Sequence, residues 1–303
     1  MTSRQVDCIL ALAKTRNFNR AAESLFLSQP TITYQINAAE EEVGFRIFDR
    51  SSKGASLTPA GHQFVTELEA IQERFKRAVE QGQNFSVKYR EDIRIALPIR
   101  SAVYYLPEAI RRFAEQRSDV LISPYFNWDR CKTLFFRGDQ DILFAMEHEM
   151  IHVPDLVGHH LFDSGIYLIT TPDDPLSLHR SVEQSDLDGR TLMVGGGSPP
   201  ALQTVQNRVI ASGRVAFFNS HDHDTTLTNV AAGRGVCLAP GFLNDHNSEF
   251  ACTPFVCTEA IPCALYTHKD DRRNAVREFV ELLQAIYSEM FCQGGFQTIF
   301  QLS

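Results

Sequence analysis

Several features that would place this chain in a common protein class are missing from its sequence. No run approaches the roughly 18 uninterrupted apolar residues that a membrane-spanning helix needs. The first ten residues, MTSRQVDCIL, have no basic stretch followed by an apolar core, as a secretion signal would have. The cysteines are scattered without a CxxC pair, which argues against a zinc site or a disulfide framework; they are Cys8, Cys131, Cys237, Cys252, Cys257, Cys263 and Cys292. We therefore expect a cytoplasmic protein with free thiols and no membrane contact.

Recognisable catalytic motifs are missing as well. The chain shows no Ser/His/Asp order, Walker loop or nucleophile elbow, and GGGSPP at 195–200 lacks the third glycine of a dinucleotide fingerprint. The HDHD run, His221–Asp224, invites a metal interpretation. The related hydrolase pattern HxHxDH would need Asp and His where this chain has Thr225 and Thr226, so a solvated loop or pocket lining fits better. We predict no catalytic residue, no metal and no cofactor.

Charge is distributed unevenly along the 303 residues. The chain carries a net charge of −8, which taken alone would argue against nucleic acid. Through Ala60, however, seven basic residues face six acidic ones, so this segment is at +1 and the remainder at −9. Because phosphates meet only the surface that docks, the local balance matters more than the total. The length predicts two or three domains, at roughly 150 residues each.

Helical periodicity dominates the N-terminal segment. Val6, Ile9, Leu10 and Ala13 recur at the spacing of one buried helix face, and Ala21, Ala22, Leu25 and Phe26 predict a second, shorter helix. A third helix begins at Ser28, a favourable N-cap residue, with Pro30 in its first turn. Ile32, Ile36, Ala39 and Val43 form its buried side. Two helices joined by a short turn are typical of a helix-turn-helix unit.

The exposed side of the third helix is polar but uncharged. It carries Thr33, Tyr34 and Asn37, with Ser28, Gln29, Pro30 and Thr31 at the N-terminal end. In a helix-turn-helix the second helix lies in the major groove, where Gln and Asn pair with adenine and Ser and Thr bond bases or phosphates. Glu40, Glu41 and Glu42 follow at the far end and are expected to point away from DNA. We expect substitution of Glu41 to affect mainly stability.

A short hairpin is predicted directly after this helix. The segment FRIFDRSSKGASLTPAG, residues 45–61, reads as strand, turn, strand and helix start. Arg50, Ser52 and Lys53 lie at or near its tip, where a wing would touch the DNA backbone or minor groove. The alternative, a three-helix module without a ligand, is weakened by this basic wing next to a polar helix face.

The residues of this region resemble those of the LysR-type transcriptional regulators. The resemblance rests on Phe18, Ala21, Ala22, Leu25, Ser28, Gln29, Pro30, Ile36, Glu41, Gly44, Leu57, Thr58, Pro59 and Gly61, together with FDR at Phe48–Arg50. In that family the segment is a winged helix-turn-helix, so the resemblance implies binding to double-stranded operator DNA. Tyr34 departs from the Ser or Ala of many relatives, so a base preference does not carry over.

A long helix is expected to follow the wing. Thr58 and Pro59 cap it, and it runs to about Gln83. Its apolar stripe has the spacing of a coiled coil and consists of Phe64, Leu68, Ile71 and Phe75, continued by Ala78 and Val79. The stripe predicts a dimer, which agrees with the family's linker helix; packing on the chain's own C-terminal domain is the alternative. A hinge is expected over Gly82–Asp92.

From Ile93 the sequence alternates between strand-like and helix-like segments. This alternation predicts a parallel sheet with helices on both faces. A second set begins at GIYLITT, residues 165–171, and ALYTHK with the helix 271–291 returns to the first. The overall fold class is thus an all-α winged helix-turn-helix, a long linker helix and a two-lobed α/β domain like the periplasmic binding proteins. We expect boundaries at 1–59, 60–90 and 91–303, with lobe I at about 91–163 plus 267–303 and lobe II at about 164–266.

A ligand in such a fold lies between the lobes, where strands end and helices begin. Three junctions are candidates, although each alone could be an ordinary turn. Their residues are Pro98, Ile99, Arg100 and Ser101; Gly197, Ser198 and Pro199; and His221 and Asp222 within the 219–225 junction. Two helix N-termini weakly favour a carboxylate, which Asp222 and Asp224 would repel. The family's peroxide sensors carry a cysteine pair near 198–208, where this chain has none, so thiol sensing is disfavoured.

The sequence therefore predicts a DNA-binding transcriptional regulator that responds to a small-molecule effector. The alternative is a cytoplasmic solute-binding protein or enzyme with a helical N-terminal appendage; the absence of a recognised signal peptide and catalytic constellation counts against it. Tetramer formation is implied by the resemblance alone, and RNA polymerase is a further candidate partner.

Overall fold

A computed structural model describes residues 1–51, 54–85, 89–245 and 248–292. The chain separates into two compact units, Met1–Lys88 and Tyr89–Ser303. Among the described residues no helix is long and apolar enough to cross a lipid bilayer.

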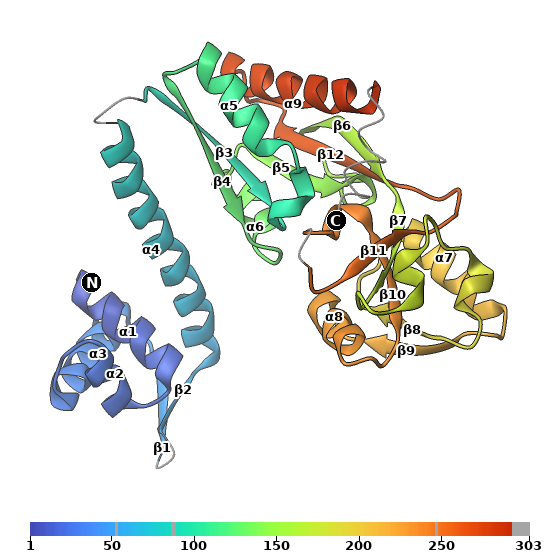
Figure 1. The fold of residues 1–303 in the computed structure, drawn as a ribbon. Helices are drawn as coiled ribbons and strands as arrows, with labels where there is room; N and C mark the ends of the chain where they lie inside the picture. The colour runs from blue at the N-terminus through green and yellow to red at the C-terminus, as the bar shows by residue number, and fades with distance from the viewer. Residues whose placement is uncertain (52–53, 86–88, 246–247, 293–303) are drawn as a thin grey trace. The chain divides into compact units, whose positions relative to one another are not determined.

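The first unit contains the three short helices, the hairpin and the long helix that the sequence predicted (Figure 1). Its elements are α1 (Ser3–Thr15), α2 (Phe18–Ser24), α3 (Gln29–Val43), β1 (Phe48–Ser51), β2 (Gly54–Leu57) and α4 (Pro59–Phe85). Strands β1 and β2 pair antiparallel, with Phe48 opposite Leu57. The turn residues Ser52 and Lys53 lie outside the described residues.

Side-chain caps define where these helices start. The Thr2 hydroxyl accepts a hydrogen bond from the Gln5 amide at 3.3 Å, and the Gln5 side chain accepts one from the Thr2 amide at 2.6 Å, which completes a capping box. The Asn17 side chain caps α2. Ser28 caps α3, as predicted, by accepting from the Thr31 amide at 3.3 Å. Each cap pairs an amide that has no partner within the helix.

The core of the first unit differs in two places from the predicted faces. In α1 the fully buried residues are Cys8, Ile9 and Leu12. Ile9 was predicted to be buried, whereas Val6, Leu10 and Ala13 of the predicted face are half-buried at the edge. Phe26 is 97% exposed, because the turn after α2 has left the helix there and Phe26 takes a positive φ of 54°. Its placement on the buried face of the second helix was therefore wrong.

The base of α4 packs closely on Arg46 and Ile47, which directly precede the first wing strand. The Thr58 hydroxyl accepts from the Gly61 amide at 2.9 Å and donates to the Arg46 carbonyl at 2.7 Å, which fixes the start of the helix. A Cβ on Gly61 would lie 2.0 Å from the carbonyl oxygen of Ile47. Only glycine therefore permits this approach.

The second unit consists of two mixed sheets flanked by helices (Figure 1). Its strands are β3 (Glu91–Leu97), β4 (Val120–Phe126), β5 (Ile142–Met146), β6 (Leu156–Ser164), β7 (Ile166–Thr170), β8 (Thr191–Gly195), β9 (Ala216–Ser220), β10 (Val236–Pro240), β11 (Ala251–Pro254) and β12 (Ile261–His268). Its α-helices are α5 (Leu106–Gln116), α6 (Cys131–Phe136), α7 (Pro200–Ala211), α8 (His223–Ala231) and α9 (Asn274–Cys292). The 3-10 helices are η1 (Arg100–Val103), η2 (Glu147–Glu149), η3 (Pro175–Leu178), η4 (Gln184–Leu187) and η5 (Gly241–Leu243).

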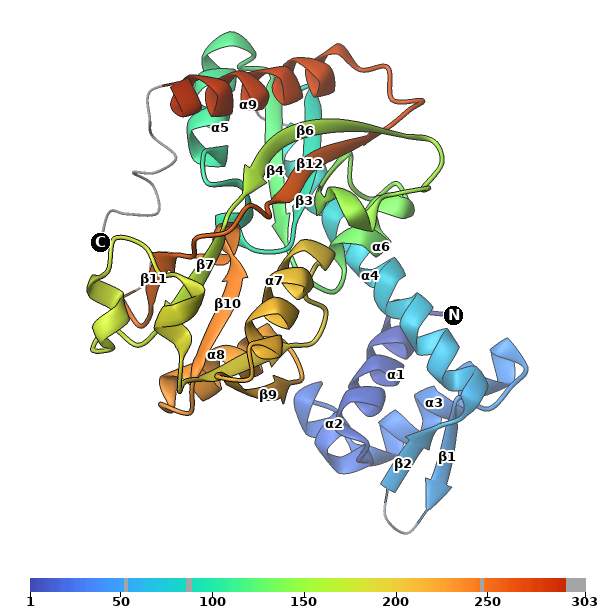
Figure 2. The ribbon, with the colours of Figure 1, turned by 90° about the vertical axis from the view of Figure 1, so that its right-hand side faces the viewer.

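The strand orders are β4-β3-β5-β12-β6 in one sheet and β11-β7-β10-β8-β9 in the other. The predicted parallel pairing is confirmed for β3 with β4 and β5, and for β8 with β9 and β10. Both sheets are nevertheless mixed, because β12 runs antiparallel to β5 and β6, and β7 runs antiparallel to β10 and β11. The chain passes between the sheets twice, from β6 to β7 and from β11 to β12 (Figure 2).

Residues 100–116 contain two helices, η1 and α5, and α5 has Pro107 in its first turn. Two boundaries also differ from the sequence prediction. Within the expected hinge, α4 continues to Phe85 and β3 already starts at Glu91. The return strand β12 starts at Ile261, before the predicted lobe boundary at 267.

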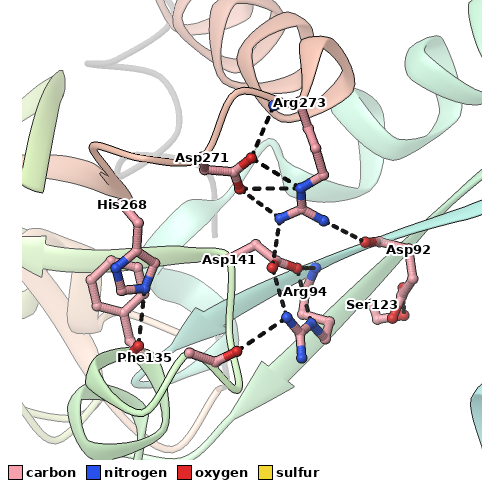
Figure 3. A network of polar contacts seen from close by, with 9 residues as sticks. Asp92, Arg94, Ser123, Phe135, Asp141, His268, Asp271 and Arg273 are labelled. Carbon is pink, nitrogen blue, oxygen red and sulfur yellow. Dashed lines mark hydrogen bonds and ion pairs between the residues drawn. The ribbon is translucent and has the colours of Figure 1, made fainter. Parts of the chain in front are cut away.

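A network of ion pairs joins β3, β5 and α9 (Figure 3). The carboxylate of Asp141 accepts from the Arg94 amide at 2.7 Å, from Arg94 Nε at 2.9 Å and from Arg94 Nη2 at 2.7 Å. Arg273, just before α9, contacts the same carboxylate at 2.6 Å and donates to the Asp92 carbonyl at 3.3 Å. The network thus fixes the first strand of this unit to its last helix.

Candidate DNA-binding surface and effector pocket

The N-terminal half of α3 presents the uncharged polar face that the sequence predicted. Ser28, Gln29, Pro30 and Asn37 are exposed, and Tyr34 is 70% exposed. Thr31 and Thr33 are half-buried and bonded to this face: Thr31 Oγ1 lies 2.7 Å from Ser28 Oγ, and Gln29 Nε2 donates to Thr33 Oγ1 at 2.9 Å. The opposite face is anchored in the core by Ile32, Ile36 and Ala39. The helix is therefore held rigidly by its apolar side.

The acidic residues at the end of α3 have separate roles. Glu40 accepts backbone hydrogen bonds from Ile47 at 2.7 Å and Phe48 at 2.9 Å, so it anchors the first wing strand. Glu42 pairs with the N-terminal ammonium group. Glu41 is exposed. The contacts that support the wing thus come from Glu40, and the expectation that substitution of Glu41 affects mainly stability stays a prediction.

Arg50 lies on β1 beside α3. Its guanidinium donates to Asn37 Oδ1, lies 3.8 Å from Glu40 Oε2 and stands over the Phe18 ring at 5.3 Å from the centroid. The sequence assigned Arg50 to a phosphate contact, whereas the folded chain surrounds its guanidinium with three of its own groups.

The apolar stripe of α4 is divided into two parts. Leu68 is buried, and Phe64 packs edge-to-face on Phe45 at 5.3 Å, so both contribute to the core of the first unit. Farther along, Ile71 is 60% exposed, Phe75 71% and Val79 45%. Only this second part is an exposed apolar face; Phe64 and Leu68, predicted to face a partner, pack within the chain.

In the second unit, a cavity of about 70 Å³ lies where strands β8 and β10 end and α7 and α8 begin. Its lining comes from both sheets and comprises Trp128, Met146, Gly195, Gly196, Gly197, Ser198, Pro199, Leu202, His223, Thr226, Cys237, Leu238, Ala239, Pro240, Phe242 and Leu243. One water needs roughly 10–15 Å³ of such space. The cavity thus has room for a molecule of a few heavy atoms.

A second cavity, of about 40 Å³, shares Trp128, Met146 and Phe242 with the first. Pro98 and Cys131 also line it, as does the ion pair between Lys132 and Glu149. We call the two cavities together the inter-sheet pocket. Its walls are mainly apolar, with polar groups at either end.

The polar groups of the first cavity are mostly neutral. Burial lowers the pKa of His223, against the raising effect of Asp222, Asp224 and Asp245. Burial also raises the pKa of the Cys237 thiol. This cavity therefore favours a ligand with a largely uncharged body.

The predicted effector residues fall into two groups. Gly197, Ser198 and Pro199 line the first cavity and Pro98 lines the second. The remaining five do not line either cavity; they are Ile99, Arg100, Ser101, His221 and Asp222.

The physical reasons are local. Arg100 is exposed on η1. The Asp222 carboxylate is used as the N-cap of α8, accepting from the Thr225 amide at 2.7 Å, which lowers its pKa. The HDHD run lies beside the pocket, but His223 rather than His221 lines it. Trp128 and Phe242 carried no sequence signal, because Trp128, in a turn, and Phe242, on η5, reach the pocket only through the fold. Within the described ranges no group of three or more His, Cys, Asp or Glu residues is placed to hold a metal ion.

Comparison with known proteins agrees with this architecture. Residues 3–62 match the family described as "Bacterial regulatory helix-turn-helix protein, lysR family", and residues 88–287 match the LysR substrate binding domain. The Hca operon transcriptional activator HcaR of Escherichia coli (strain K12) is 24% identical over 94% of this chain and 97% of its own. The hydrogen peroxide-inducible genes activator of Dickeya chrysanthemi is 27% identical over 79% of both chains.

Among solved structures, full-length CbnR in complex with its target DNA has a TM-score of 0.71 at 21% identity, covering 94% of this chain and 99% of that one. A further crystal structure of CbnR, described as a LysR family transcriptional regulator, has a TM-score of 0.72 over the same shares of both chains. The fold is thus shared over nearly the whole length. The chain belongs to the LysR family of bacterial transcriptional regulators, and it is a DNA-binding regulator with an effector-binding domain and not an enzyme.

Proposed function

We propose that the protein reads its operator through the N-terminal half of α3 and adjusts this binding when an effector occupies the inter-sheet pocket. The residues proposed to form the DNA-binding surface are Ser28, Gln29, Pro30, Thr31, Thr33, Tyr34 and Asn37, with Arg50, Ser52 and Lys53 at the wing. The observation that carries this assignment is the exposed, uncharged hydrogen-bonding face of α3, which is followed directly by a two-stranded hairpin.

The division of labour follows from the chemistry of the two partners. Side-chain amides and hydroxyls exchange hydrogen bonds with base edges, which carry sequence information, whereas a cation at the tip of the wing, Lys53, meets phosphates. A titration of labelled upstream DNA with the full chain tests the proposal, read by fluorescence anisotropy at two salt concentrations. We expect a sequence-selective, salt-sensitive complex at nanomolar to micromolar protein, on the order of specific binding by such modules. Equal affinity for unrelated DNA would contradict it.

For the effector we propose a small molecule with a mainly apolar body and a carboxylate. The apolar lining supports the body, and the start of α7 at one wall supports the anionic group. Trp128 is the single tryptophan, is half-exposed and lines both cavities, so its fluorescence reports occupancy. We expect the fluorescence of Trp128 to change saturably when a matching small carboxylate, identified by a screen, is added.

A cavity-filling variant sharpens this test. Ser198→Phe places a ring in the first cavity and should abolish the fluorescence change, whereas Thr204→Phe on the exposed side of α7 should not. Retained binding by Ser198→Phe would place the effector elsewhere.

Peroxide sensing through thiols is not part of the proposal, although one similar protein is named for that response. Burial raises the pKa of Cys252 to about 12 and that of Cys237 as well. Because the thiolate is the reactive form, these two sulfurs are poor nucleophiles at neutral pH.

We propose that two copies pair through the exposed part of the α4 stripe, Ile71, Phe75 and Val79, with Phe64 and Leu68 supporting it from the core. An exposed apolar row on a long helix is stabilised by burial against a second copy. Phe75→Glu should raise the dimer dissociation constant by at least about tenfold, as loss of one buried aromatic ring implies, while Lys76→Glu beside it should not. Analytical ultracentrifugation distinguishes these outcomes; dimers that survive Phe75→Glu would refute this interface.

Pairs of dimers, forming a tetramer, extend this proposal. The proposed boundaries are 1–59 for DNA binding, 60–90 for dimerisation and hinge, and 91–303 for the effector. A cytoplasmic location and contact with RNA polymerase follow as proposals from action at a promoter.

A further inference from the structure

Arg50 connects three elements of the DNA-binding unit. It lies on β1, and its guanidinium contacts Asn37 and Glu40 of α3 and the Phe18 ring at the start of α2. Asn37 and Glu40 are three residues apart, so they occupy neighbouring positions on one side of α3. The wing strand is thereby tied to the middle of the helix that faces DNA.

The contact with Asn37 determines how that side chain is oriented. A guanidinium has only hydrogen-bond donors, so it can pair with the amide oxygen of Asn37 but not with its amide nitrogen. A charged donor also makes a hydrogen bond about twice as strong as a neutral one. The Asn37 oxygen is therefore turned toward Arg50, and the Asn37 NH2 group remains as the group available to a base.

The surroundings of Arg50 weaken its case as a phosphate contact. Glu40 Oε2 lies 3.8 Å from the guanidinium and offsets its positive charge. The face of the guanidinium is covered by the Phe18 ring at 5.3 Å. Two groups of the chain's own thus compete with a phosphate for this guanidinium.

We propose that Arg50 is a positioning residue for base reading: it holds Asn37 so that the Asn37 NH2 group donates to an acceptor on one base edge. The matching edges in the major groove are purine N7, guanine O6 and thymine O4. This inference rests on the proposed DNA surface of α3. It assigns to Arg50 an effect on sequence preference, whereas a phosphate contact would affect all sequences alike.

The test uses the full chain and a randomised duplex library. Selection with the native protein gives its preferred site, and anisotropy with single-base variants of that site gives the preference at each position. The same measurements are made for Asn37→Ala, Arg50→Ala, the double variant and Arg50→Lys. Arg50→Lys separates the effect of charge from that of geometry, because it keeps the positive charge but cannot both bond Asn37 and stack on Phe18 in the same way.

We expect Asn37→Ala, Arg50→Ala and Arg50→Lys to lose preference at the same base pair, by roughly five-fold or more, the lower range for one base contact. The double variant should be no worse there than either single variant, because both changes remove one contact. The dependence of affinity on salt should stay the same for Arg50→Ala.

Other outcomes would overturn the inference. If Arg50→Ala weakens binding to every sequence equally, lowers the salt slope by about 0.9 and is rescued by Arg50→Lys, Arg50 is a phosphate contact. If Arg50→Ala does not fold, Phe18→Leu provides the test, because it keeps the Arg50 charge and removes the ring on which the guanidinium stacks. An unchanged preference of Phe18→Leu at the base pair read by Asn37 would contradict the proposal. Failure of the native protein to select any site would instead refute the DNA surface itself.

Discussion

Asp141 is the centre of the ion-pair network in the effector domain, and its removal gives a sharp test of what stabilises that domain. Its side chain is only 6% exposed and accepts three hydrogen bonds from Arg94 and one from Arg273. In Asp141→Asn one of the two oxygens becomes an NH2 group. That group cannot accept, and it points its own donors at a guanidinium.

The expected cost follows from the burial of the three partners. Breaking a fully buried ion pair costs about 3–5 kcal/mol. The side chains of Arg94 and Arg273 are 26% and 37% exposed, so water partly replaces the lost acceptor. We therefore expect Asp141→Asn to lower the free energy of unfolding by about 2–3 kcal/mol. For a domain of this size that corresponds to a fall in Tm of about 4–12 °C.

Urea and thermal unfolding of the full chain measure this effect. Fluorescence of Trp128 follows the effector domain alone, since the chain has no other tryptophan. Glu115→Gln is the matched control: its ion pair with Arg111 at 2.6 Å is more than half exposed on both sides, and its loss should leave the midpoint unchanged.

The dependence on pH gives a second measurement. Burial alone would raise the pKa of Asp141, but hydrogen bonds from Arg94 and the charges of Arg94 and Arg273 outweigh it and lower the pKa. The stabilisation is therefore fully present above the unfolded pKa of about 3.9 and is lost as the pH falls through the lower folded pKa. Asp141→Asn should remove this acid-dependent part of the free energy of unfolding. A midpoint equal to that of Glu115→Gln, or an unchanged acid profile, would refute the reasoning.

Three further predictions concern the DNA-binding unit. Gly61→Ala should unfold or loosen the DNA-binding unit, because the new Cβ would lie 2.0 Å from the Ile47 carbonyl oxygen. The expected result is a loss of DNA binding while the unfolding transition followed by Trp128 fluorescence stays unchanged. Gln29→Ala should reduce discrimination among operator variants with little effect on stability, and equal discrimination in competition anisotropy would contradict it. Thr33→Ala should also reduce discrimination, since the Thr33 hydroxyl accepts a hydrogen bond from the Gln29 side-chain Nε2 at 2.9 Å and holds that side chain in place.

Much of the first unit could be predicted because its signals are local. The cap at Ser28, the proline in the first turn of α3 and the apolar repeat Ile32, Ile36 and Ala39 all lie within one short segment. The same holds for the strands of the second unit, whose short apolar runs are visible without any knowledge of their neighbours. The strand β6 was missed because the sequence LVGHHLFDS interrupts apolar alternation with glycine, histidine and aspartate.

The tertiary structure decided what each side chain does once distant segments meet. It moved Phe64 and Leu68 into the core and left Ile71 and Phe75 exposed, although all four share one periodic stripe. It also placed Arg50 against Asn37.

The inter-sheet pocket shows most clearly the difference between local sequence signals and tertiary contacts. Glycine, proline and serine at a strand end marked one wall in the sequence, while Trp128, Phe242 and His223 came from other parts of the chain. The sequence by itself determined the local helices, the caps and the family. The tertiary structure alone decided which residues share a cavity, a network or a binding face, because these contacts join residues far apart along the chain and no local periodicity encodes them.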